Sequence, residues 1–304
     1  MTPTANVATM TIVVYFEDAA IGELARDRIR TLASKHPSRV ILFDATADSE
    51  RREEGPDWIE IGVKSAQPVA LSSALAELRV REVPVVLLWI APGIGDDERF
   101  CALAPDAQTI VYNSSLVHEG DEALRELVDY VARHPELALA DIAYLRLAPW
   151  QESVAILFDG SDVAELSRLQ RVEVTCGSEP EAFYLLGWLA SRLNWSPGDP
   201  NTVRDRSGNP VEYAITREGE PRRIRRVALR SSNATFVAEV DRNGETIALR
   251  VENGGSHPQR NRAIEDPGIA ALVERAILAG HHDRIFAESL AAAGGILSRR
   301  KEQP

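Results

Sequence analysis

The turn Ala91–Glu98 contains the residue types that come closest to a phosphate-binding site. It follows the most apolar strand that the sequence predicts, Val83–Trp89, at the position where a doubly wound sheet binds a nucleotide phosphate. The third glycine position of such a fingerprint is Glu98, and the carboxylates of residues 96–98 would repel an anion while they stabilise a helix start. We therefore expect this turn to cap a helix with acidic residues and not to bind phosphate.

The histidines and cysteines are not spaced for metal or nucleophilic chemistry. His281 and His282 are adjacent, so on a helix they would point about 100° apart and could not chelate as an i, i+4 pair does. Cys101 and Cys176 lie in different halves of the chain, and sparse thiols are typical of a reducing compartment. The sequence contains no Gly-x-Ser-x-Gly elbow and no Walker loop. It predicts no catalytic residue, no metal site and no cofactor.

Arg146 and Trp150 lie in the stretch Tyr144–Asp159, near the middle of the chain. We expect this stretch to be an extended arm that leads into a short buried helix, because Pro149 is suited to the first turn of a helix. Arginine and tryptophan each combine a large contact area with a directional polar group, so both residues are candidates for partner binding. The alternative for Trp150 is core packing between two domains.

A second candidate contact is a stripe at helical spacing, formed by Tyr184, Trp188 and Arg192. These residue types carry much of the binding energy in protein interfaces. The same spacing suits a core helix whose arginine covers an indole ring, which is the alternative for Trp188.

One basic block, residues 221–230, stands in an otherwise acidic chain. A phosphorylated ligand or an acidic partner could bind its arginines, of which the candidates are Arg222, Arg223, Arg225 and Arg226. The alternative is an edge strand whose charges prevent aggregation.

The charge and composition exclude several classes of protein. The chain has 34 Lys and Arg against 46 Asp and Glu, a net charge of −12, whereas binding to nucleic acid or to an anionic membrane needs excess positive charge. With 44% hydrophobic and 26% charged residues, it has the composition of a soluble globular protein. No apolar run approaches the length of a membrane span, and no basic region precedes an apolar stretch at Met1–Thr9. We expect a cytoplasmic protein.

The first half of the chain alternates strands with helices, which predicts an α/β domain with a doubly wound, mainly parallel sheet. The strand at 83–89 should be central because it is the most apolar. We expect residues 45–56 to form an exposed loop. The predicted strands are 10–16, 40–43, 58–63, 83–89 and 108–112, and the predicted helices are 21–32, 71–78 and 119–133.

The second half has a different pattern, because several strands follow one another without helices between them. This predicts an α+β domain with an antiparallel sheet, and the change of pattern predicts domains at 1–160 and 161–304. A capping box at Ser178–Glu181 should open a helix, and Asn243–Gly244 should form a type I′ hairpin turn. The predicted strands are 171–176, 211–216, 224–230, 235–240 and 246–251, and the predicted helices are 178–193, 267–278 and 283–293.

Four phrases and the C-terminal helices resemble the glucose-6-phosphate dehydrogenase assembly protein family, OpcA, and occur in that family's order. The phrases are HPSRVI at 36–41, VPVVLLW at 83–89, RLAPWQE at 146–152 and GWLASRLNW at 187–195, and the helical segment is 265–293. The resemblance covers nearly the whole chain.

This resemblance implies a protein that is not an enzyme but binds glucose-6-phosphate dehydrogenase and promotes its assembly or activity. It would then be an allosteric effector in the oxidative pentose phosphate pathway, with Arg146, Trp150, Trp188 and Arg192 at the motif centres. Two alternatives remain open from the residues. One is a regulatory protein that senses a nucleotide or sugar phosphate through the arginines of the basic block, and the other is a hydrolase with a pair of carboxylates.

Overall fold

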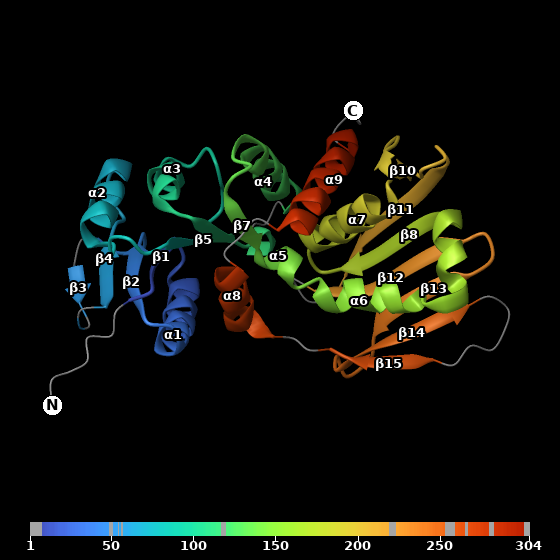
Figure 1. The fold of residues 1–304 in the computed structure, drawn as a ribbon, viewed down its shortest axis with the longest axis horizontal. Coiled ribbons are helices and arrows are strands. Elements are labelled where there is room, and N and C mark those ends of the chain that lie inside the picture. Colours follow the sequence, from blue (N-terminus) through green and yellow to red (C-terminus); the bar gives the residue numbers. More distant parts are fainter. Residues whose placement is uncertain are drawn as a thin grey trace. The chain divides into compact units, whose positions relative to one another are not determined.

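The computed structural model describes residues 8–48, 51–53, 55, 57–116, 120–218, 223–252, 259–264, 267–279 and 283–300 (Figure 1). The chain forms two compact units that interleave in sequence. Unit 1 comprises residues 1–116, 129–142 and 267–283, and unit 2 comprises residues 117–128, 143–266 and 284–304. Arg222, His281 and His282 lie outside the described residues. The division of the chain at residue 160 stays a prediction.

Unit 1 is built on a sheet with the strand order β3-β4-β2-β1-β5-β6-β7. All neighbouring strands are parallel except the edge pair β3 and β4. The six parallel strands follow the order 3-2-1-4-5-6 of a doubly wound sheet. Their bounds are β1 Met10–Phe16, β2 Ser38–Asp44, β4 Trp58–Gly62, β5 Val85–Ile90, β6 Thr109–Tyr112 and β7 Ala138–Asp141, and β3 is Arg51–Glu53.

Helices cover both faces of this sheet, with α2 and α3 on one face and α1 and α8 on the other (Figure 1). This explains the unbroken apolar runs of β1 and β5, which are buried on both sides. Helix α1 turns one face inward through Gly22, Ala25, Ile29 and Leu32. The helix bounds are α1 Ala19–Lys35, α2 Pro68–Leu78, α3 Glu98–Leu103, α4 Gly120–Arg133 and α8 Gly268–Ala279, and the units divide α4 after Val128.

Unit 2 is built on a mixed sheet with the order β15-β14-β13-β12-β8-β11-β10-β9. Only β8 and β11 pair in parallel, and the other neighbours are antiparallel. The strand bounds are β8 Leu169–Cys176, β9 Ser196–Pro197, β10 Thr202–Arg204, β11 Pro210–Arg217, β12 Ile224–Ser231, β13 Thr235–Val240, β14 Thr246–Glu252 and β15 Arg260–Ala263.

The helices of unit 2 pack on one face of its sheet (Figure 1). Helix α7 contacts β8 and β11, whereas α6 contacts β13 and β14. Helices α7 and α9 lie very close together, because a Cβ atom at Gly187 would come within 2.2 Å of the Ser289 carbonyl oxygen. The helix bounds are α5 Ile142–Leu145, α6 Ala148–Leu157, α7 Glu179–Leu193 and α9 Arg284–Arg300, with a 3-10 helix at Gly160–Arg168.

The predicted fold class is confirmed, including the interior position of β5, but several local predictions were wrong. The arm before Pro149 is not extended, because β7 leads directly into helix α5. The expected loop at 45–56 contains β3, and the short strands β7, β9, β10 and β15 were not predicted. Strand β12, which was considered as an edge strand, lies inside the sheet between β13 and β8.

Two predicted local motifs also differ in the structure. Ser178 is the N-cap residue of α7 but makes no side-chain capping bond, so the capping box does not form. The β13–β14 turn is not type I′, because only Gly244 in it has a positive φ. The carboxylate of Asp241 accepts hydrogen bonds from the backbone N–H groups of Glu245 and Thr246 and stabilises a longer loop. Among the described helices, none is long and apolar enough to cross a membrane.

Candidate functional site

The strand order of unit 1 places one candidate site at the carboxyl ends of β1 and β5. In a doubly wound sheet the crossover direction reverses between these two strands, and ligands bind in the crevice outside their carboxyl ends. We call this place the switch-point crevice. It is formed by the turn between β1 and α1, the turn after β5, and the end of β2.

The β1–α1 turn contains one glycine at the spacing of a dinucleotide-binding fingerprint. In a Gly-x-Gly-x-x-Gly pattern that ends at Gly22, the first two glycine positions are Glu17 and Ala19. Gly22 itself is required for packing, because a Cβ atom there would lie 2.4 Å from the ring of Phe16. Among the turns, only the one after β5 was predicted as a candidate phosphate site, although the position of Gly22 after the first strand could have identified the β1–α1 turn as well.

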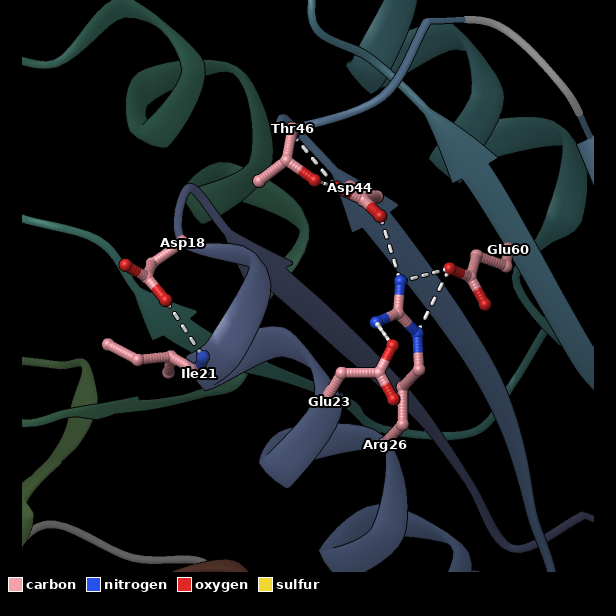
Figure 2. Close-up of polar contacts among 7 residues, drawn as sticks. All are labelled: Asp18, Ile21, Glu23, Arg26, Asp44, Thr46 and Glu60. Carbon is pink, nitrogen blue, oxygen red and sulfur yellow. Dashed lines mark hydrogen bonds and ion pairs between the residues drawn. The ribbon is translucent and has the colours of Figure 1, made fainter.

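Asp18 occupies the N-terminus of α1 (Figure 2). Its Oδ1 accepts a hydrogen bond of 2.9 Å from the backbone N–H of Ile21, and the residue has an extended backbone typical of an N-cap. A carboxylate at this position also stabilises the positive end of the helix dipole. The first turn of α1 is therefore stabilised by the chain's own anion.

At the end of β2, the buried Asp44 side chain is fully engaged (Figure 2). Its Oδ1 accepts hydrogen bonds from the backbone N–H and the hydroxyl of Thr46, at 2.8 and 2.6 Å. Its Oδ2 lies 2.8 Å from Nη2 of Arg26. In dinucleotide-binding folds an acidic residue about 20 positions beyond the fingerprint binds the ribose at this end of the sheet.

Arg26 connects α1 to two strands. Besides Asp44 it hydrogen-bonds Glu60 on β4 and Glu23 on its own helix, and its guanidinium carbon lies 4.9 Å from the centre of the Phe16 ring. Although burial opposes it, Glu60 and Asp44 raise the pKa of Arg26 above its usual value. The side chains of Arg26, Asp44 and Glu60 are 16%, 10% and 17% exposed, so these three charges are largely shielded from water.

Aromatic and polar side chains lie next to one another near the carboxyl ends of β1 and β5. The rings of Tyr15 and Trp89 stack with centroids 4.2 Å apart. The Tyr15 hydroxyl donates to Glu17 Oε1 at 2.7 Å and accepts from Arg99 Nη1 at 2.8 Å. Burial, together with Glu17, raises the pKa of Tyr15 above its usual value in spite of Arg99, so the phenol stays protonated at neutral pH.

The turn after β5 is a helix cap, as its acidic residues predict. Asp97 is the N-cap of α3, and its Oδ1 accepts hydrogen bonds of 2.8 Å from the backbone N–H groups of Arg99 and Phe100. Gly93 and Gly95 have φ angles of 82° and 95°, which suit glycine.

The first predicted contact pair, Arg146 and Trp150, is part of the packed interior of unit 2. Trp150 is 7% exposed, on the face of α6 that contacts β13 and β14. Nη1 of Arg146 lies 3.6 Å from Oε1 of Glu181, a carboxylate that is 2% exposed in the first turn of α7. The predicted capping box needed the Glu181 side chain to cap the start of α7. In the structure this side chain lies near Arg146 instead.

The second predicted pair, Trp188 and Arg192, is more accessible. Trp188 is half-buried and Arg192 is exposed, whereas Tyr184 of the same stripe is fully buried beside Tyr144. Arg192 forms an ion pair with Glu288 on α9. The stripe thus runs from the core of unit 2 at Tyr184 to its surface at Arg192.

The basic block lies on β12, where neighbouring carboxylates neutralise part of its charge. Glu173 on β8 accepts hydrogen bonds from Arg171 and Arg230 and lies 3.8 Å from Arg226. Although burial opposes it, Arg171 and Arg230 lower the pKa of Glu173. Arg223 and Arg225 are exposed. A hollow of about 470 Å³ at the Arg171 and Arg230 end is lined by neither Arg223, Arg225 nor Arg226.

The two thiols form no disulfide, and Cys176 is buried whereas Cys101 is exposed. Burial, with Glu181 and Glu179, raises the pKa of Cys176 to about 12, and burial with nearby aspartates also raises that of Cys101. Across the described part of the chain, no group of three His, Cys, Asp or Glu side chains could hold a metal ion.

Comparison with protein families gives a match over about half of the chain. Residues 137–290 match the family described as the C-terminal domain of a glucose-6-phosphate dehydrogenase subunit. The chain is 28% identical over 189 residues to the OpcA protein of Synechocystis sp., covering 55% of this chain and 39% of that relative. It is 29% identical over 207 residues to the OpcA protein of Nostoc punctiforme, covering 67% and 42%. The names of both relatives assign them to the OxPP cycle, and the chain spans about two fifths of their length.

Several solved structures with a similar fold are oxidoreductases. A 3-ketoreductase from Actinomadura kijaniata, in complex with TDP-benzene and NADP, superimposes with a TM-score of 0.59 at 12% identity, covering 96% of this chain and 97% of that chain. An aldose-aldose oxidoreductase from Caulobacter crescentus gives a TM-score of 0.53 at 12% identity, covering 97% and 98%. At this identity the similarity establishes the fold alone.

Proposed function

The chain belongs to the OpcA family of glucose-6-phosphate dehydrogenase assembly proteins, and we propose that it is a non-catalytic partner of glucose-6-phosphate dehydrogenase that favours the enzyme's assembled, active form. The observation that carries the proposal is the match over residues 137–290, which include most of the sheet of unit 2 and the helix α7. The place of action would be the oxidative pentose phosphate pathway.

The proposed mechanism is thermodynamic linkage. A protein that binds one state of its partner more tightly than another shifts the population towards that state, by an amount set by the difference in affinity. No step of this mechanism requires a nucleophile, a general base or a metal ion. The high pKa values of Tyr15 and Cys176 are consistent with side chains that do no acid–base chemistry near neutral pH.

We propose that the exposed members of the predicted contact set meet the enzyme. Arg192 and Arg225 are exposed, and Trp188 is half-buried. Trp150 and Arg146 are held by contacts inside unit 2, so their proposed role is to support the fold behind this surface. Interface energy concentrates in tryptophan and arginine, which favours Trp188 and Arg192 among the candidates.

The test is to mix the chain with glucose-6-phosphate dehydrogenase from its own organism. Analytical ultracentrifugation should show co-sedimentation, and the enzyme's rate, followed by NADPH absorbance, should rise most at high dilution, where the enzyme tends to dissociate. The chain alone should not reduce NADP with glucose 6-phosphate. Independent sedimentation together with an unaltered rate at every dilution would refute the proposal.

Charge-reversal variants locate the contact. Arg192→Glu and Arg225→Glu should each weaken co-sedimentation, and the affinity of the unaltered chain should fall as salt rises if exposed charges contribute. Arg204→Glu is a matched control, because Arg204 is also an exposed arginine of unit 2 but pairs locally with Asp199. Equal effects of all three substitutions would indicate a general charge effect and would exclude this surface.

A further inference from the structure

We propose that the switch-point crevice does not accept a dinucleotide, because side chains of the chain itself take the positions that such a ligand's phosphate and ribose would occupy. The fold of unit 1 is the one that binds dinucleotides in many proteins, so its strand order alone would suggest a nicotinamide cofactor. The inference concerns unit 1 alone and is independent of the proposed partner.

The phosphate end of the crevice is blocked by charge and by bulk. A dinucleotide's pyrophosphate would need the free backbone N–H groups at the start of α1, but the carboxylate of Asp18 already accepts from the N–H of Ile21. Glu17 adds a second carboxylate at the first glycine position, and two neighbouring anions repel a third. Ala19 carries a Cβ atom at the second glycine position, where a bound pyrophosphate would approach the backbone closely.

The ribose end is also engaged. The hydroxyls of a ribose would have to compete at Asp44 with Thr46 and with the guanidinium of Arg26. Arg26 is held by Glu60 as well, and leaving this carboxylate unpaired in a largely shielded place is unfavourable. The side chain of Arg26 thus completes Asp44 from within the protein (Figure 2).

Gly22 is the one glycine of the dinucleotide-binding pattern that this chain has. Gly22 is needed by the protein itself, since any side chain there would collide with Phe16. The two glycine positions that have other residues, Glu17 and Ala19, are those that serve the turn and the ligand. The chain therefore retains the packing of the fold and lacks the residues that would make it a dinucleotide site.

The test is thermal unfolding of the full chain with NAD, NADH, NADP and NADPH at concentrations from 10 µM to about 5 mM, with titration calorimetry as the second measurement. A ligand present at 100 times its Kd would raise Tm by on the order of 5 °C. We expect no saturable rise and no calorimetric signal. A saturable rise with any of the four nucleotides would overturn the inference, whereas partner binding would be unaffected by that result.

A variant that removes the block makes the inference sharper. Glu17→Gly, Asp18→Asn and Ala19→Gly together restore the glycine pattern and remove both charges while keeping an N-cap residue. Combined with Arg26→Ala, which frees Asp44 at the ribose end, these substitutions should give saturable binding of at least one nucleotide. Asp97→Asn, which neutralises the N-cap of the neighbouring α3, is the matched control and should gain none. A combined variant that unfolds cooperatively but still binds nothing would exclude these four side chains as the block.

Discussion

The two sheets of this protein differ in how helices cover them and in where their charged side chains lie. The sheet of unit 1 has helices on both faces, and the polar side chains of its candidate site, such as Glu17 and Asp44, lie at or just beyond the carboxyl ends of β1 and β2. The sheet of unit 2 has helices on one face only, and its other face bears arginines and glutamates of β8, β11 and β12 that pair with one another. These charged side chains thus lie at the strand ends in unit 1, and across the helix-free face of the sheet in unit 2.

This difference bears on two candidate functions, dinucleotide binding by unit 1 and partner binding by unit 2. In unit 1 the carboxylates of Asp18 and Asp44 already bind backbone N–H groups and an arginine, which argues against a dinucleotide there. Unit 2 also has accessible side chains, such as Arg192 on α7, that can meet a second protein. The contrast therefore favours unit 2 as the part that contacts a partner and unit 1 as a support. Four substitutions test it, in order of decreasing effect.

Trp150→Ala should lower the free energy of unfolding by about 3–5 kcal/mol, because a buried indole leaves a cavity between α6 and the sheet of unit 2. Urea unfolding followed by circular dichroism is the measurement. Trp188→Ala, at a half-buried position, should cost clearly less. If the two substitutions were equal, Trp150 would not be part of the core of unit 2 and would again be a candidate for partner contact.

Gly22→Ala should destabilise the protein by roughly 1–3 kcal/mol, because the added methyl group would force Phe16 and α1 apart. Leu24→Ala is the control on the same helix, since Leu24 is 63% exposed and its truncation should change stability by less than about 0.5 kcal/mol. Equal melting temperatures for Gly22→Ala and the unaltered chain would mean that the close packing of α1 on β1 is not required.

Glu173→Gln should cost about 0.5–1 kcal/mol at pH 7, because Arg171, Arg226 and Arg230 would lose their shared carboxylate at a partly exposed place. The folded-state pKa of Glu173 is lower than its unfolded value, so its contribution is present above the unfolded pKa and is lost as the pH falls through the folded pKa. The stability difference between the variant and the unaltered chain should therefore shrink below about pH 4.5. A difference that grows on acidification would contradict the ion-pair assignment.

Arg192→Ala should change stability by less than about 0.5 kcal/mol, because its ion pair with Glu288 is exposed. Its effect should appear instead in binding to the dehydrogenase, measured by sedimentation. A large loss of stability would show that Arg192 supports the packing of α7 on α9. Arg192 would then no longer be a candidate for contact with the enzyme.

Hydrophobic patterning was sufficient to predict most of the strands and helices. The apolar runs of β1 and β5 reflect burial on two faces, and the spacing of Ile29 and Leu32 reflects burial on one side of α1. Short elements escaped prediction because few residues carry their pattern, as in the alanine-containing β7, or because pairing alone defines them, as in β9 and β10. The type I′ turn was wrongly predicted because Asp241, two residues before Asn243, binds the loop backbone.

The fold class and the family could both be established from the order of residues alone, since they depend on patterns and phrases that are local in the chain. The packed structure was needed to show which turn faces the switch-point crevice, and that Arg26 meets Asp44 and Glu60 across 18 and 34 positions of sequence. It was also needed to show that Trp150 is buried while Arg192 is accessible. The physical reason is that periodicity reports which side of an element is apolar, whereas the partner of a charged side chain depends on strand order and register.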